Sequence, residues 1–428
     1  MQNIDKPQLA NNVKRLGHFD LPGGGQVVVD GDYAYVGHMD PPHGTTILDI
    51  SNPTKPHIVS QITLPDNYSH THKVRVVDDL MFTNYEQFNR HFLRKGDALP
   101  DVRKKLKLRL GRAATDAEVA SEIGGVQASD IEMLDQARER GYHNGGFCIY
   151  DISDRANPNL LCHKKTYGFG VHRFDVDHNF AYMSTEMEGY LGNILIVYDY
   201  SMPTDPTEVS RWSMPGQHLA GGEKPSWNGY RNRLHHAIRV GDELWASCWH
   251  AGLRVIDASD IRNLKTIGEY DYHPPIPEPT HTVMPLEKTI DGRRIAIVVD
   301  EEHTHSQGRL HGFMWVFDVT DLKNIKPISI WDLSEMDSPY SRVAGGRFGA
   351  HQYREKLDST VIYLTWFAGG LRIVDVANPE LPSEIGFYIP EPLNEHNAPQ
   401  SNDVDVGENG LIYLLDRNAG FDILEFAP

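Results

Sequence analysis

Short runs of β-branched and aromatic residues recur along the chain, and most of them follow a glycine and end at an acidic residue. Side chains of this kind suit a pleated, half-buried strand. The runs lie at residues 44–50, 146–152, 192–199, 252–257, 312–318, 370–375 and 420–425. Some are followed by a turn signal, such as the Asn-Pro pair at residues 52–53. Repetition of one strand-rich unit predicts a β-propeller, in which each unit forms one blade.

Further strand patterns flank each run. Residues 26–29 and 33–36 predict a strand pair around a tight turn, and residues 267–270 are typical of a fourth strand that follows a run. The last unit stops after its third strand, whereas residues 16–19, ahead of the first unit, look like such a fourth strand. We therefore predict an all-β fold: a seven-bladed β-propeller closed by its own N-terminal strand, and a single domain over residues 1–428.

The runs at residues 253–257 (Leu-Arg-Val-Ile-Asp) and 371–375 (Leu-Arg-Ile-Val-Asp) resemble the LVIVD repeat, a propeller-type repeat of bacterial and archaeal proteins. The resemblance covers nearly the whole chain and implies a propeller fold. It implies no particular activity, because the fold hosts many functions.

The strands expected nearest the propeller axis begin with histidine in five consecutive blades. The aligned positions are His72, His172, His236, His281 and His351, with Gln26 and Asn402 in the first and last blades. Because these strands converge on the axis, we expect five imidazoles to face one another at one mouth of the channel. Imidazole is the commonest protein ligand for transition metals, so the pattern predicts a divalent metal site with three or four direct ligands. The alternative is a structural ring, inherited by duplication, whose imidazoles hydrogen-bond neighbouring blades.

Two choices complete the predicted site. His235 and His236 are adjacent, so only one can face the channel, and the alignment selects His236. The second strands should end at the same mouth, where several of them carry carboxylates, Glu86 among them. Of these, Glu186, Glu188 and Glu301 are the best candidates to orient the imidazoles or to act as general bases.

One segment interrupts the repeat. Residues 88–143 fall between the second and third strands of the second blade, and apolar positions at 101–106, 117–123 and 130–140 have helical spacing. We predict a helical insertion. Because a loop between these strands lies at the histidine mouth, the insertion is either a lid or substrate wall, or a homodimer contact. The two roles are compatible.

Net charge and cysteine content limit which partners and cofactors we expect. The net charge of −18 argues against nucleic acid or an anionic membrane, since both bind basic surfaces. The three cysteines form no Cys-x-x-Cys pair, which indicates neither a zinc–cysteine site nor a disulfide framework. Residues 1–7 lack a signal-peptide pattern, and no apolar run is long enough to span a membrane. The expected location is the cytoplasm.

Three functions stay open. The first is a metal-dependent enzyme acting on a small organic substrate, with iron or copper and oxidative chemistry favoured. A histidine-dominated site of this kind is similar, in architecture only, to that of carotenoid-cleaving oxygenases. The second is a lyase or hydrolase that uses manganese or zinc as a Lewis acid. The third is a non-catalytic propeller that binds a protein or peptide.

Overall fold

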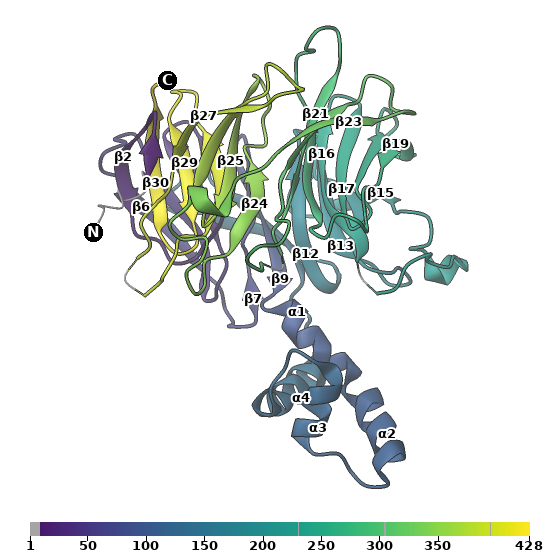
Figure 1. Ribbon diagram of the computed structural model, residues 1–428. Helices are drawn as coiled ribbons and strands as arrows, with labels where there is room; N and C mark the ends of the chain where they lie inside the picture. The colour runs from purple at the N-terminus through teal and green to yellow at the C-terminus, as the bar shows by residue number, and fades with distance from the viewer. Residues whose placement is uncertain (1–8, 230, 304, 394) are drawn as a thin grey trace.

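The computed structural model describes residues 9–229, 231–303, 305–393 and 395–428. Residues 1–7, on which the cytoplasmic expectation partly rests, lie outside the described part. Most of the regular structure is antiparallel β-sheet in which strands that follow one another in the chain pair side by side. Figure 1 shows these sheets grouped around a common centre, with a helical segment projecting from them. The predicted all-β, propeller-like architecture is confirmed.

The strands form four-stranded units, each ordered from the centre of the molecule outwards. The first strands are β3 (Gly24–Asp30), β7 (Ser69–His70) with β8 (Val74–Val77), β12 (Tyr167–Val176), β16 (Asn232–Val240), β20 (Thr280–Pro285), β24 (Phe348–Tyr353) and β28 (Ser401–Val406). The second strands are β4 (Tyr33–His38), β9 (Leu80–Gln87), β13 (Phe180–Glu186), β17 (Glu243–Trp249), β21 (Ile295–Asp300), β25 (Val361–Phe367) and β29 (Ile412–Asp416).

The outer strands complete the units. The third strands are β5 (His43–Asp49), β10 (Gly146–Asp151), β14 (Ile194–Asp199), β18 (Leu253–Asp257), β22 (Met314–Asp318), β26 (Leu371–Asp375) and β30 (Gly420–Phe426). The fourth strands are β6 (His57–Thr63), β11 (Asn159–Lys165), β15 (Thr207–Trp212), β19 (Lys265–Tyr270), β23 (Lys326–Trp331), β27 (Ser383–Tyr388) and β2 (Val13–Phe19).

The two ends of the chain lie in the same sheet. Strand β2 pairs with β30 from Val13, opposite Phe426, to Phe19, opposite Phe421. A short strand, β1 (Ala10–Asn11), pairs with β27. The first strands contact one another in chain order, and β28 also contacts β3.

The acidic residue that ends most of the repeated runs has a local structural role. Asp49, Asp151 and Asp257 each accept a hydrogen bond from the backbone N–H two residues further on, at 2.9 Å. This turn redirects the chain from the third strand towards the fourth. The apolar residues before it are buried: in β14, Ile194 to Val197 are fully inaccessible to solvent. Burial and turn together explain the repeated pattern.

Apolar side chains between neighbouring units form the core. One buried cluster extends from β16 to β26 and contains Trp245, Trp315 and Trp366. Packing of this kind makes the units rigid, which fixes the residues at the centre of the molecule.

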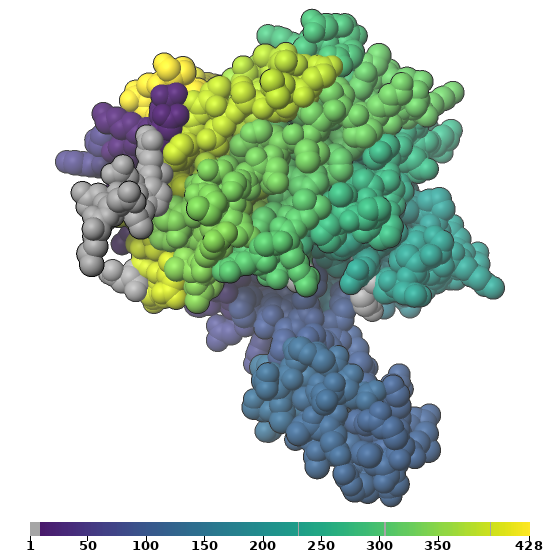
Figure 2. Space-filling model, in the orientation of Figure 1, coloured from purple at the N-terminus to yellow at the C-terminus, as the bar shows by residue number. Residues whose placement is uncertain are grey.

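The segment between β9 and β10 is helical. Its helices are α1 (Arg90–Leu93), α2 (Leu99–Leu110), α3 (Asp116–Ile123) and α4 (Ile131–Arg140), with short 3-10 turns η1 (Arg94–Ala98) and η2 (Ala128–Asp130). Elsewhere η3 (Leu219–Gly221) and η4 (Glu335–Asp337) are single turns. Leu99, Leu106 and Leu134 are buried in a small core of the insertion's own. Figures 1 and 2 show α2–α4 projecting away from the strands. None of the described helices has the length and apolar character needed to cross a membrane.

Candidate metal centre

Each first strand loses its regular pairing at a corresponding place. In β20, Thr280 pairs with Asp300 and Thr282 with Val299, so His281 between them has no paired residue. Such a bulge re-aims the unpaired side chain. Corresponding interruptions leave out His172, His235, His351, Gly25 and Asn402, while His72 lies in the gap between β7 and β8.

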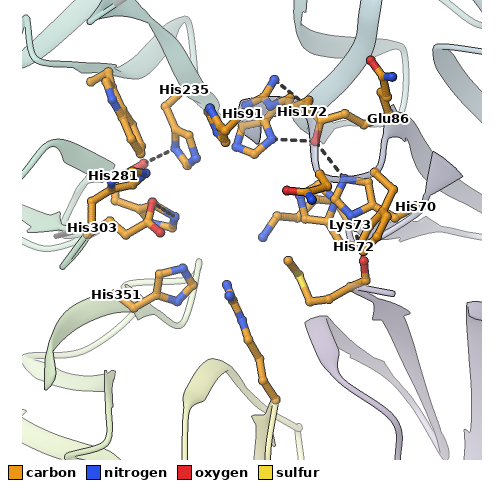
Figure 3. A pocket seen from close by; sticks show the side chains of 18 of the residues that line it. His70, His72, Lys73, Glu86, His91, His172, His235, His281, His303 and His351 are labelled. Atoms are coloured by element: carbon orange, nitrogen blue, oxygen red, sulfur yellow. Dashed lines mark hydrogen bonds and ion pairs between the residues drawn. The ribbon is translucent and has the colours of Figure 1, made fainter. Parts of the chain in front are cut away.

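Five of these positions form an arc of imidazole rings, which we call the histidine arc: His72, His172, His235, His281 and His351. Neighbouring ring centroids along it are 5.3, 5.0, 4.3 and 4.5 Å apart. The arc lines a cavity of about 480 Å³, which is also lined by His70, His91 and His303 (Figure 3). The predicted convergence of histidines on one cavity is therefore present in the structure.

One histidine of the predicted set is misplaced: His235, and not His236, lines the cavity. In β3 the irregular position is likewise Gly25 and not the aligned Gln26. Both ring nitrogens of His236 are engaged elsewhere. Its Nε2 lies 3.2 Å from the carbonyl oxygen of Phe174, and its Nδ1 accepts a hydrogen bond from Nε of Arg173 at 2.9 Å. Because neither nitrogen keeps a free lone pair, His236 cannot serve as a ligand in this arrangement.

Hydrogen bonds fix the proton position in three imidazoles of the arc. Nδ1 of His235 lies 2.8 Å from the carbonyl oxygen of His281, and Nδ1 of His351 contacts the carbonyl oxygen of Asn402. Since a carbonyl oxygen only accepts, each Nδ1 carries the proton and each Nε2 keeps its lone pair.

His281 reaches the same state through a relay. Its Nδ1 lies 3.1 Å from the hydroxyl oxygen of Thr282, and that hydroxyl donates to Oε1 of Gln352 at 2.6 Å. The hydroxyl proton is thus used, so the hydroxyl oxygen accepts from Nδ1–H of His281. Nε2 of His281 is left with a lone pair as well.

Glu86 organises the other end of the arc. Its Oε2 lies 3.0 Å from Nδ1 of His172 and 3.0 Å from Nε2 of His70, while Oε1 pairs with Arg90. A carboxylate on Nδ1 is the usual way to orient a metal-binding imidazole. His70 also donates from Nδ1 to the carbonyl oxygen of Met39 at 3.0 Å. Its Nε2 therefore faces Glu86 with a lone pair unless a proton or a cation lies between them.

Burial keeps the histidine arc uncharged. It lowers the pKa of His172 to about 4 and the pKa of His72, His235, His281 and His351 well below the ordinary value. Neutral imidazoles are the form that binds a metal ion.

The three predicted carboxylates lie in different surroundings. Glu301 lines the cavity, 4.0 Å from Nε2 of His281, and pairs with Arg347 at 2.8 Å. Burial opposes ionisation of Glu301, but Arg347 and the nearby histidines outweigh it and hold the pKa of Glu301 well below its usual range. Glu186 instead pairs with Arg94, and Glu188 is exposed in the turn after β13; neither lines the cavity.

Three sets of side chains among the described residues could each hold a cation. Two are in the cavity: His70, His72 and Glu86, and His235, His281 and Glu301, with the ligand atoms of each set within 4.8 Å of one another. The third, Glu302, His305 and His311, does not line this cavity.

The insertion contributes to the cavity only through its beginning. Residues 88–91 line the wall, including His91 and Arg90. The role of a lid or substrate wall stays a prediction. The homodimer contact stays a prediction; α2 and α4 present Leu108, 80% exposed, and Met133, 44% exposed.

Several cavity residues were outside the predicted set. His70 shares a strand face with His72 in the pattern His-x-His, which is a usable signal. Glu86 is one of the carboxylates at the strand ends but is not among the three best candidates predicted from the sequence. Trp249, Arg233 and Arg417 carry no local signal, because only the three-dimensional arrangement brings them to the cavity.

The repeated units match the model of a known repeat family. The family model of the LVIVD repeat matches residues 24–63, 141–166 and 362–389. The chain carries LVIVD repeats. The first match spans β3 to β6, which is one four-stranded unit, whereas the second covers β10 and β11 and the third runs from β25 to β27. Among curated proteins, none matches the sequence.

Solved structures resemble the LVIVD-repeat chain in fold. The β-propeller domain of Cps50 (Swd1) from Myceliophteria thermophila is 10% identical, with a TM-score of 0.52 over 96% of this chain and 99% of that one. A chain of the Mitotic Checkpoint Complex is 8% identical, with a TM-score of 0.51 over 99% and 97%. At such identities the likeness shows the fold alone.

Proposed function

We propose that the protein is a metal-dependent enzyme that acts on a small organic substrate in the histidine-lined cavity. The observation that carries the proposal is the shared state of His172, His235, His281 and His351. In each, Nδ1 has a partner in the protein, and Nε2 is left for another ligand. A structural ring of histidines would use both nitrogens, as His236 does.

These four imidazoles would supply ligands to a divalent transition metal ion, beginning with His235 and His281, whose ligand atoms lie within 4.8 Å of each other and of Glu301. Glu86 and Glu301 would orient the imidazoles or hold a proton nearby. The donor set of neutral nitrogens suits iron and copper, and such an ion supplies oxidative chemistry when bound. We therefore favour an oxidoreductase or oxygenase. The cavity volume of about 480 Å³ fits a small organic molecule.

A lyase or hydrolase that uses manganese or zinc is the second candidate. It is favoured by Glu301, a carboxylate held 4.0 Å from Nε2 of His281, where a general base would be needed. A non-catalytic propeller that binds a protein or peptide is the third candidate. The similar chain from the Mitotic Checkpoint Complex supports it, because that chain is part of an assembly.

We also propose that the units form seven blades and that β2 closes the ring. Support comes from the pairing of β2 with β30 and from the contact between β28 and β3, the first strands of the last and first units. Closure removes the sheet edges that an open array would present.

Elemental analysis of purified protein tests the proposed function. We expect near-stoichiometric metal in the wild type and its loss in His235→Ala/His281→Ala. His178→Ala is the matched control, because that histidine has 76% of its side chain exposed, outside the cavity.

The identity of the metal separates the candidates. Iron or copper supports oxidative chemistry and directs substrate screening under oxygen, whereas manganese or zinc supports the lyase or hydrolase. Wild-type protein that carries no metal, and takes up none on reconstitution, contradicts both enzymes and leaves the interaction propeller.

A further inference from the structure

The cavity has a charge opposite to that of the whole protein. The chain has a net charge of −18, yet the cavity is lined by five cationic side chains and only two carboxylates. The cations are Lys73, Arg90, Arg233, Arg347 and Arg417, and the carboxylates are Glu86 and Glu301. The excess positive charge is therefore a local feature of the cavity.

Both carboxylates are already paired. Glu86 pairs with Arg90, and Glu301 with Arg347. Within the described ranges, Lys73, Arg233 and Arg417 have no acidic side chain within salt-bridge distance. Arg417 donates from Nε to Asn402 at 2.7 Å. Among described residues, the charged ends of Lys73 and Arg233 have no hydrogen-bond acceptor.

Unpaired charges of this kind are costly when they are buried. Lys73 is 4% exposed and Arg233 is 7% exposed. Burial lowers the pKa of Lys73 well below its usual range, so the lasting positive charge here is that of Arg233 and Arg417. Both guanidinium groups still carry a charge at neutral pH. Figure 3 shows the side chain of Lys73 directed into the cavity between the two ends of the histidine arc.

Aromatic rings hold two of the cations beside the histidine arc. The guanidinium of Arg233 lies 4.7 Å from the ring of Trp249, which lies 5.2 Å from His235. At the other end, Arg347 lies 3.9 Å from the ring of Phe367, which lies 4.5 Å from His351.

Both aromatic residues have a strained backbone. Trp249 has φ of +54° and Phe367 has φ of +34°, in the left-handed region that bulky residues avoid. Strain of this kind is typically maintained where a side chain must be positioned for function.

We infer that the cavity binds an organic oxyanion, such as a carboxylate, through Arg233 and Arg417, with Lys73 beneath it. Guanidinium groups match the planar geometry of a carboxylate or the oxygens of a phosphate. The inference names the substrate class of the proposed enzyme and rests on that function only in taking this cavity as the site of reaction.

A neighbouring cavity extends the binding region. It has a volume of about 880 Å³ and shares His91, Arg233, Trp249 and His303 with the histidine-lined cavity. Its other walls include Pro275, Pro277 and Pro279. Arg233 thus lies where the two cavities meet, in position to hold the anionic group of a molecule whose apolar part extends into the proline-lined space.

Binding of three probes of similar shape tests the inference: benzoate, phenyl phosphate and neutral benzyl alcohol. Calorimetry or ligand-observed NMR should give a lower Kd for one or both anions than for the alcohol. We expect Arg233→Gln and Arg417→Gln to raise the anion Kd by about 10- to 100-fold, the usual value of hydrogen bonds to charged groups. The better of the two anions identifies the oxyanion.

Two controls isolate the guanidinium groups. Arg262→Gln removes an exposed arginine that lines neither cavity and should leave the Kd unchanged. Arg233→Lys keeps the charge and should retain part of the affinity. Equal binding of anions and alcohol, or an unchanged anion Kd in both glutamine variants, overturns the inference.

Repeating the titrations after metal removal separates this inference from the proposed function. Anion binding that survives chelation and is weakened by Arg233→Gln supports the oxyanion site even if no metal is ever found. Anion binding that requires metal and ignores both arginines supports a metal centre and contradicts the oxyanion site.

Discussion

The first strands share one backbone irregularity around the channel but present two kinds of side chain at it. From β7 to β24 the irregular position holds the five histidines of the histidine arc, whereas in β3 and β28 it holds Gly25 and Asn402. The two sides have different tasks. His172, His235, His281 and His351 each keep an Nε2 for the cavity, whereas Nδ1 of His72 accepts from the side-chain amide of Asn84 at 3.1 Å. Gly25 and Asn402 contact the two ends of the arc.

Gly25 makes room for the first histidine of the arc. A Cβ atom at Gly25 would lie 2.7 Å from Cβ of His72 and 2.5 Å from its carbonyl oxygen. Asn402 holds the last one, since its carbonyl oxygen accepts from Nδ1 of His351. Its side chain also accepts from Arg417 and donates to the carbonyl oxygen of Gly25. The same backbone position therefore carries a proposed ligand in some units and a supporting residue in β3 and β28.

Removing one histidine and one supporting residue is the most direct test of this division of roles. His235→Ala should lose most of the bound metal, because it deletes a ligand whose Nε2 faces the cavity. Asn402→Ala should keep the metal, since Asn402 holds His351 through its backbone carbonyl oxygen, which the substitution leaves in place. Metal content per protein, measured on both variants, checks this. Equal loss in the two variants would mean that the division into ligand and support is wrong.

The repeat and most of the histidine arc were accessible from the sequence. The repeated runs are strongly periodic, and aligning the starts of the first strands finds four of the five histidines of the histidine arc. His235 was missed because the fourth unit differs in length. Arg173 stands three residues before the last paired residue, Val176, but His236 stands four before Val240. Alignment from the strand end is therefore displaced by one residue, which exchanges the two histidines.

The rest of the cavity was beyond the reach of sequence patterns. Glu86 and Glu186 both occur near the ends of second strands, and their surroundings alone distinguish them. Glu86 faces His70 and His172, whereas Glu186 faces Arg94. The unpaired cations come from segments far apart in the chain, and their lack of partners is a property of the folded molecule.

Adding a side chain at Gly25 is a second test of the supporting role of this residue. Gly25→Ala should lower the free energy of unfolding by about 1–3 kcal/mol, the usual cost of overpacking. It should also weaken metal binding indirectly, because His72 must move and its ring lies 5.3 Å from that of His172. Gly31→Ala is the control for metal binding: nothing lies within 4 Å of a Cβ there. Denaturant unfolding and metal titration measure both effects. Unchanged metal affinity in Gly25→Ala would separate His72 from the metal centre.

The smallest expected effect concerns orientation within the histidine arc. Thr282→Val removes the hydroxyl that accepts from Nδ1 of His281, while the ring itself stays in place. The proton is then free to move to Nε2, which would oppose metal binding there. Losing an orienting partner typically costs about 10- to 100-fold in metal affinity, and we expect the lower end because His172, His235 and His351 keep theirs. Competition with a chelator measures the Kd, and Thr185→Val, a buried threonine of β13 outside the cavity lining, is the control. If Thr282→Val binds metal as tightly as Thr185→Val does, the relay through Thr282 does not set the state of His281, and the metal would rest on the other three imidazoles.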